Sequence, residues 1–128
     1  MNSITRHNAL RNLTGEHHSG LILCWKIRQG ISKNIDPARI REYCSHFYKI
    51  HLADHFQEEE KFIFPLLGKN HPMIKKALND HRKLIENFIK EQDNLKAVNY
   101  TKKNLEKHIR FEERNFLMRS RKELRTVN

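Results

Sequence analysis

The sequence predicts an all-α protein, folded as an up-down-up-down bundle of four helices. Glycine and proline are scarce, at four and three among 128 residues, and no β-branched alternation is long enough to indicate a sheet. Apolar side chains instead recur at intervals of three and four residues, as on helices that bury one side. The polar segments between these stretches are short, which favours antiparallel neighbours. We expect a single domain spanning residues 1–128.

Start and stop signals delimit the four helices. Thr14 is expected to cap the first helix, and Asp36 followed by Pro37 forms a cap and first-turn proline for the second. Gly68 is expected to close the second helix, and Pro72 opens the third. The predicted helices cover about residues 15–31, 37–67, 72–92 and 99–123. The bundle core then lies at about residues 14–119, followed by a basic C-terminal tail at 119–128.

Composition favours a globular protein that does not cross a membrane. Hydrophobic residues make up 38% of the chain and charged residues 31%, which is typical of a folded domain. No apolar run approaches the roughly 18 residues needed to span a bilayer, and the start, MNSITRHNALRNL, lacks the apolar core of a signal peptide. Cys24 and Cys44 are too few for a disulfide framework. We therefore predict a cytoplasmic protein whose thiols stay reduced.

The net charge of +10 raises the question of a nucleic-acid partner. Lysine and arginine are spread along the chain, often beside glutamate, as on any solvated helix face. The densest basic stretch, RSRKELR at residues 119–125, has no interleaved aromatic residues and matches no recognition motif. Nucleic acid is therefore not expected to be the main partner. A metal-free basic helical module that binds nucleic acid or a protein partner is the alternative interpretation.

The stretch HLADHFQEEEKFIFPLL, residues 51–67, places polar side chains where a helix should be apolar. At about 100° per residue, His51, Glu59 and Phe62 all lie within about 40° of the direction of His55. Burying an imidazole and a carboxylate without partners is costly, so His55 and Glu59 need a compensating group. For His51, a role beside such a site or as a simple core residue is favoured over a role as a further ligand.

The other predicted helices carry similar residues on their inner faces. His108 and Glu112 repeat the four-residue spacing, and His81 is central to an apolar stripe. The first helix carries His17 and His18 side by side, and periodicity does not choose between them. A lone histidine such as His81 is more often a hydrogen-bonded core residue than a ligand, but two separate His-x-x-x-Glu pairs on inner faces are harder to explain without metal. The candidate ligands are His18 or His17, His55, Glu59, His81, His108 and Glu112. Four imidazoles with two carboxylates suit a pair of first-row metal ions.

These motifs resemble those of the hemerythrin-like domains, also called HHE cation-binding domains. HFQEEEKFIFPLL resembles the family's second-helix motif, and HIRFEERNFL its fourth-helix counterpart. GEHHSGLILCWKIRQG and NDHRKL resemble the segments that supply single histidines from the first and third helices, so the resemblance covers about residues 14–119. In the family the first-helix histidine is commonly followed three residues later by leucine. His18, with Leu21, is therefore preferred over His17.

The resemblance implies a centre of two non-haem iron ions bridged by Glu59 and Glu112, with zinc or another divalent metal as a substitute. Such centres bind oxygen, nitric oxide or peroxide, and family roles include sensing of oxygen or iron, protection from nitrosative stress and repair of iron centres. Small ligands such as O2 or NO are the expected partners, together with an unidentified protein for a sensing role. No catalytic residue is assigned, and an enzymatic role is not expected.

Two positions depart from the oxygen-carrying hemerythrins. The carriers have a second histidine four residues after the first on the third helix, where this chain has Ile85. They also have an aspartate on the fourth helix, where this chain has Glu112. The chain therefore resembles the bacterial and regulatory members of the family more than the carriers, which argues against oxygen storage as its role.

Overall fold

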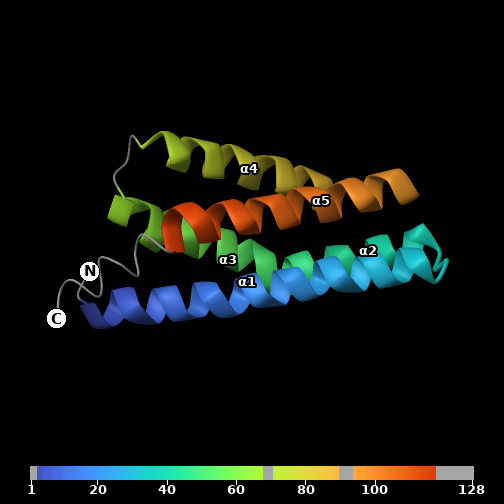
Figure 1. Ribbon diagram of the computed structural model, residues 1–128, viewed down its shortest axis with the longest axis horizontal. Helices are drawn as coiled ribbons and strands as arrows, with labels where there is room; N and C mark the ends of the chain where they lie inside the picture. Colours follow the sequence, from blue (N-terminus) through green and yellow to red (C-terminus); the bar gives the residue numbers. More distant parts are fainter. Residues whose placement is uncertain (1–2, 68–70, 90–93, 118–128) are drawn as a thin grey trace.

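The computed structural model describes residues 3–67, 71–89 and 94–117. Its elements are α1 (Ser3–Ser32), α2 (Pro37–Phe47), η1 (Tyr48–Leu52), α3 (Ala53–Glu58), η2 (Glu59–Ile63), η3 (Phe64–Leu67), α4 (Pro72–Ile89), α5 (Leu95–Glu112) and η4 (Glu113–Leu117). The elements from α2 to η3 follow one another as a single helical segment, so the described chain forms four antiparallel helical segments (Figure 1). The predicted four-helix bundle is confirmed, and no strand occurs among the described residues.

Two of the predicted helix starts are confirmed and two are wrong. The Asp36 side chain accepts a hydrogen bond from the Ala38 amide at 3.0 Å and caps α2. The third helix begins at Pro72, as expected. By contrast, α1 begins at Ser3, so Thr14 lies within the helix and does not mark its start. The helix α5 begins four residues early because Asn94 caps it, accepting a hydrogen bond from the Ala97 amide at 2.8 Å. Gly68, the end of the third helix at residue 92 and the tail at 119–128 lie outside the described residues.

The second helical segment departs from a regular α-helix on both sides of His55. The elements η1 and η2 are π-helical and lie before and after the short helix α3. A π turn accommodates an extra residue and shifts the positions that face the core. The buried positions become Leu52, His55, Phe56, Glu59 and Ile63. The expectation that His51 and Phe62 lie on this buried face is therefore wrong, because both are exposed.

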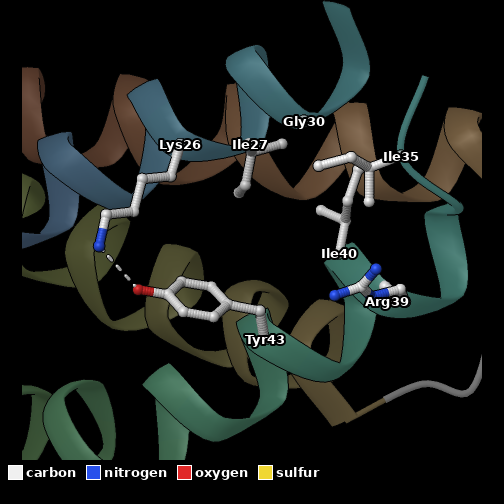
Figure 2. A pocket seen from close by; sticks show the side chains of 7 residues that line it. All are labelled: Lys26, Ile27, Gly30, Ile35, Arg39, Ile40 and Tyr43. Atoms are coloured by element: carbon white, nitrogen blue, oxygen red, sulfur yellow. Dashed lines mark hydrogen bonds between the residues drawn. The ribbon is translucent and has the colours of Figure 1, made fainter. Parts of the chain in front are cut away.

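The helices pack closely at the end of the bundle where α1 and α2 meet. Gly30 on α1 allows this, since a Cβ atom there would lie 3.1 Å from Cδ1 of Ile40. Figure 2 shows Ile27, Gly30, Ile35 and Ile40 lining a pocket, with the Lys26 ammonium donating a hydrogen bond to the Tyr43 hydroxyl at 3.0 Å. These contacts hold α1 against α2 close to the turn that joins them.

The apolar core runs along the inside of the bundle. Its buried members are Leu23, Cys24, Ile27, Ile40, Cys44, Leu52, Phe56, Leu84, Phe88, Val98, Leu105 and Ile109. Both cysteines are free, as predicted, and burial raises their thiol pKa values to about 12 for Cys24 and about 11 for Cys44. In the part of the chain that the structure describes, no helix is long and apolar enough to cross a membrane.

Candidate metal centre

Four histidines and two glutamates, drawn from all four helical segments, meet inside the bundle. They are almost inaccessible to solvent: His17 2%, His55 3%, Glu59 1%, His81 1%, His108 2% and Glu112 0% exposed. Each helical segment contributes one imidazole, and the second and fourth segments also contribute one glutamate each. The fold therefore brings six polar side chains together from positions up to 95 residues apart in the sequence.

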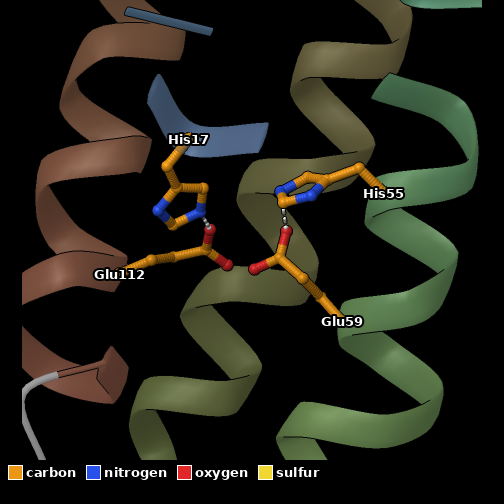
Figure 3. A group of neighbouring side chains, drawn as sticks. All are labelled: His17, His55, Glu59 and Glu112. Carbon is orange, nitrogen blue, oxygen red and sulfur yellow. Dashed lines mark hydrogen bonds and ion pairs between the residues drawn. The ribbon is translucent and has the colours of Figure 1, made fainter. Parts of the chain in front are cut away.

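One group joins His17 and His55 to the two glutamates. His17 Nε2 lies 2.9 Å from Glu112 Oε1, and His55 Nε2 lies 2.7 Å from Glu59 Oε1. Figure 3 shows the two carboxylates pointing toward each other between the two imidazole rings. One potential ligand atom from each of the four residues lies within 4.8 Å of the others.

A second group joins His81 and His108 to the same two glutamates. His81 Nε2 lies 3.5 Å from Glu59 Oε1 and 3.5 Å from Glu112 Oε2, and His108 Nε2 lies 3.2 Å from Glu112 Oε2. The ligand atoms of this group also lie within 4.8 Å of one another. Glu59 and Glu112 thus belong to both groups, as carboxylates that bridge two ions would.

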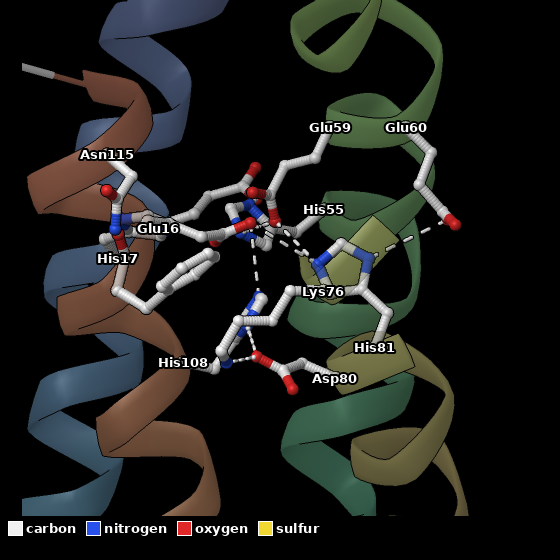
Figure 4. Close-up of polar contacts among 12 residues, drawn as sticks. Glu16, His17, His55, Glu59, Glu60, Lys76, Asp80, His81, His108 and Asn115 are labelled. Atoms are coloured by element: carbon white, nitrogen blue, oxygen red, sulfur yellow. Dashed lines mark hydrogen bonds and ion pairs between the residues drawn. The ribbon is translucent and has the colours of Figure 1, made fainter. Parts of the chain in front are cut away.

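Three further carboxylates contact the outer nitrogens of these imidazoles. Asp80 Oδ2 lies 3.2 Å from His108 Nδ1, and Glu60 Oε2 lies 3.9 Å from His81 Nδ1 (Figure 4). The Glu16 carboxylate forms an ion pair with His55 Nδ1. None of these three contacts was predicted from the sequence. Glu16 and Asp80 each stand directly before a core histidine, but that position gives no sign that they contact a histidine on another helix.

The two shared carboxylates cannot both be ionised cheaply in a site without a cation. Burial and then the neighbouring Glu112 carboxylate raise the pKa of Glu59 well above its usual range. Burial acts to raise the pKa of Glu112 as well, but the charge of His108 outweighs it and lowers that pKa. One proton held by Glu59 therefore does what a bound cation would do, which is to offset the paired negative charge.

The histidines of the second group also respond to burial and to their carboxylates. Burial acts to lower the pKa of His108, but Glu112 and Asp80 outweigh burial and raise it to about 9. For His81 burial prevails and lowers the pKa. Protons on these imidazoles and on Glu59 would have to leave when a cation binds, because only the neutral imidazole and the carboxylate are ligands.

The structure places His17, not His18, in this centre, so the preference for His18 is corrected. His17 is buried beside Glu112, whereas His18 is exposed. The sequence held a usable signal, because the buried residues Gly20, Cys24 and Ile27 follow His17 at three, seven and ten residues, as one helix face requires. The spacing to Leu21, which favoured His18, leads to a residue that is only partly buried.

Several buried donor and acceptor atoms of the centre form no hydrogen bond within the described residues. They are His17 Nδ1, Glu59 Oε1 and Oε2, His81 Nδ1 and Nε2, His108 Nε2 and Glu112 Oε2. A buried polar atom without a partner costs about 1–3 kcal/mol, so a natural core rarely keeps several at one place. Imidazole nitrogens and carboxylate oxygens are ligands for first-row metal ions, and the inward atoms of this set fit such ions.

The comparison with known protein families agrees with this donor set. Residues 8–120 match the family described as the hemerythrin HHE cation-binding domain. Neither the curated proteins nor the solved structures give a significant match. The family match covers most of the chain, including all six residues of the buried cluster. The chain therefore belongs to the hemerythrin family of HHE cation-binding domains.

Proposed function

We propose that this protein binds two non-haem iron ions in adjacent sites that share Glu59 and Glu112. His17 and His55 would complete one site, and His81 and His108 the other. The observation that carries the proposal is the pair of four-residue groups with two carboxylates in common. Two dications would offset the charge of both glutamates and bind those of their oxygens that form no hydrogen bond.

Iron is the proposed metal because the family resemblance implies it, and zinc or another divalent ion suits the same nitrogen and oxygen donors. The alternative of a metal-free helical module is less favourable, since it would leave several buried imidazole nitrogens and carboxylate oxygens, drawn from all four helical segments, without hydrogen bonds. We also infer a cytoplasmic location, which fits the two free buried thiols.

We further propose that the iron pair binds or senses small ligands such as O2 or NO, or responds to the iron or oxidative state of the cell. Non-haem iron supplies a redox-active ion that binds such ligands at a coordination position left open by the protein. Each site has two imidazoles and the two shared carboxylates. Ile85, one turn after His81 on α4, is partly buried against the core and offers no ligand where the carriers have a histidine.

The adjacent histidines of α1 provide a matched test of metal binding. His17→Ala should lower the iron content by about one ion per chain, because it removes a buried ligand of one site. His18→Ala should leave the iron content unchanged, since His18 is exposed outside both groups. Elemental analysis after anaerobic, iron-supplemented expression gives the metal content of both variants and of the wild type. Equal losses in the two variants would contradict the assignment.

Small-ligand binding can be tested at Ile85. The reduced wild-type protein should react with nitric oxide, and the oxidised protein should take up azide with a visible absorption change. Ile85→His should weaken both responses by placing an imidazole one turn after His81, whereas Ile85→Leu, which adds no ligand, should keep them. If neither azide nor nitric oxide alters the spectrum of the wild type, a closed metal-storage or structural role is the better interpretation.

A further inference from the structure

The four imidazoles of the centre all turn the same nitrogen inward. Nε2 of His17, His55, His81 and His108 is the atom closest to the shared carboxylates, at distances between 2.7 and 3.5 Å. Each Nδ1 is then directed away from Glu59 and Glu112. An imidazole that binds metal through one nitrogen usually donates the other N–H to a carboxylate, carbonyl or water, which fixes its tautomer and orientation.

Both imidazoles of the second group are held firmly in this orientation. His108 Nδ1 is hydrogen-bonded to Asp80 at 3.2 Å, and Asp80 is itself held by the Lys76 ammonium at 2.8 Å. The His81 ring is stacked on Phe56, with ring centres 4.2 Å apart, and also on Phe64, at 5.6 Å. Rotation of either ring would therefore break a charged hydrogen bond or an aromatic contact.

The first group is less well supported. Glu16 contacts His55 Nδ1 through a buried oxygen, but the Glu16 side chain as a whole is 35% exposed, against 21% for Asp80. His17 Nδ1, like His81 Nδ1, is buried and forms no hydrogen bond within the described residues, and the His17 ring meets the His55 ring edge-on, with ring centres 5.3 Å apart. The two groups thus share their carboxylates and differ in how their imidazoles are held.

From this difference we infer that Asp80 is a positioning residue for His108, and that the His81–His108 site binds its metal ion more tightly than the His17–His55 site. The inference rests on the proposed metal binding. Glu16 has the corresponding role for His55 in the weaker site. The protein would then load in two steps, with one ion retained firmly and the other, beside His17, lost first.

Stepwise titration of the metal-free full chain with Co²⁺, followed by its visible absorption, tests this inference. The wild type should show two steps, and His17→Ala should remove the weaker one. Asp80→Ala should lower the affinity for Co²⁺ in the tighter binding step by about 10- to 100-fold, which is the usual effect of losing such a contact. It should leave the affinity in the weaker binding step unchanged. Asp80→Asn, which keeps an acceptor oxygen for the Nδ1 proton, should recover part of the loss. Glu16→Ala should weaken only the weaker step.

Lys75→Ala is the matched control, because it removes an exposed cation of α4 but leaves both Asp80 and Lys76 in place. Both of its steps should stay close to those of the wild type. The positioning role is overturned if Asp80→Ala changes neither step, or changes both equally, in a protein whose wild type binds two ions. A wild type that binds no Co²⁺ overturns the proposed function itself, so the two failures are distinguishable.

A separate observation concerns the outer surface of α5. Six exposed residues lie on one face of α5 and the start of η4, at intervals of four and three residues: Lys96, Tyr100, Lys103, Lys107, Arg110 and Arg114. On a helical projection they lie within about 40° of one line, which is about 27 Å long. We name them the α5 basic stripe. Arg28 from α1 and Lys76 from α4 line the same surface hollow as the stripe residues from Lys103 onward.

The stripe carries an excess of positive charge that nearby acids do not cancel. Glu106, the acidic residue in the lining of the hollow, is paired with Arg28 at 3.3 Å, and Glu113 is paired with Arg110 at 3.4 Å. Lys96, Lys103, Lys107 and Arg114 have no ion-pair partner in the described part of the chain. The exposed cations of α5 are thus aligned on one face of that helix.

We propose that the α5 basic stripe binds the phosphate backbone of duplex nucleic acid. A rigid line of cations about 27 Å long can lie against the phosphates that border one groove of the duplex, which carries about one negative charge per 1.7 Å of axis when both strands are counted. An anionic membrane fits less well, because surface helices also insert an apolar face. The apolar face of α5, including Val98, Leu105 and Ile109, is already buried in the bundle.

Fluorescence anisotropy with a labelled 25-base-pair DNA of arbitrary sequence tests this surface on the iron-loaded protein. With about five phosphate contacts, the logarithm of affinity should fall with the logarithm of salt concentration with a slope of about −4.5. The triple variant Lys96→Gln, Lys103→Gln, Lys107→Gln should flatten the slope by about 2.7. The triple variant Lys33→Gln, Lys49→Gln, Lys83→Gln, which removes three exposed cations elsewhere, should keep the slope.

Three outcomes would overturn the proposal for the stripe. They are an absence of DNA binding by the wild type at low salt, an equal loss in both triple variants, and stripe-dependent binding to phosphatidylserine vesicles without binding to DNA. Iron content measured for each variant confirms that the substitutions leave the metal centre intact. A stripe-specific loss of DNA binding with normal iron content supports the proposal.

Discussion

Two glutamates, Glu59 and Glu112, face each other at the centre of the bundle with almost no access to solvent, and the other features of the core follow from that arrangement. Burial, and then the repulsion between the two carboxylates, raises the pKa of Glu59 well above its usual range. Four imidazoles surround the pair, and each presents Nε2 to it. The proposed metal ions resolve this concentration of donor atoms, because two dications attract both carboxylates and accept the imidazole nitrogens.

The fold supplies the rigidity that such a centre needs. Each imidazole comes from a different helical segment, so no segment can move without disturbing the cluster. The π turns η1 and η2 lie on either side of α3, where His55 and Glu59 face the core and His51 and Phe62 do not, and the π turn η4 begins directly after Glu112. Irregular turns of this kind are frequent at functional sites. Outside the cluster, Asp80, Glu16 and Glu60 contact the outer nitrogens and connect neighbouring helices.

The sequence predicted the bundle and named all six clustered residues, although it preferred His18 to His17, because the spacing of these residues matches a regular helix. Asp36 and Pro37 located a helix start correctly, and the His-x-x-x-Glu pairs identified the two helices that carry the glutamates. Regular periodicity failed at His51 and Phe62, where a π turn shifts the inward face. It also could not reveal Asp80 as a contact of His108, because that pairing joins two helices through their tertiary arrangement. The preference for His18 over His17 was avoidable, since the buried stripe of Gly20, Cys24 and Ile27 indicates His17.

The central claim is that two metal ions share Glu59 and Glu112. Crystals of the iron-loaded protein, measured at the iron absorption edge, test it most directly. The anomalous difference map should show two separate peaks, each in contact with a carboxylate oxygen of Glu59 and one of Glu112, with His17 and His55 at one peak and His81 and His108 at the other. A single peak, or peaks that contact only one of the two glutamates, would contradict the shared di-iron centre.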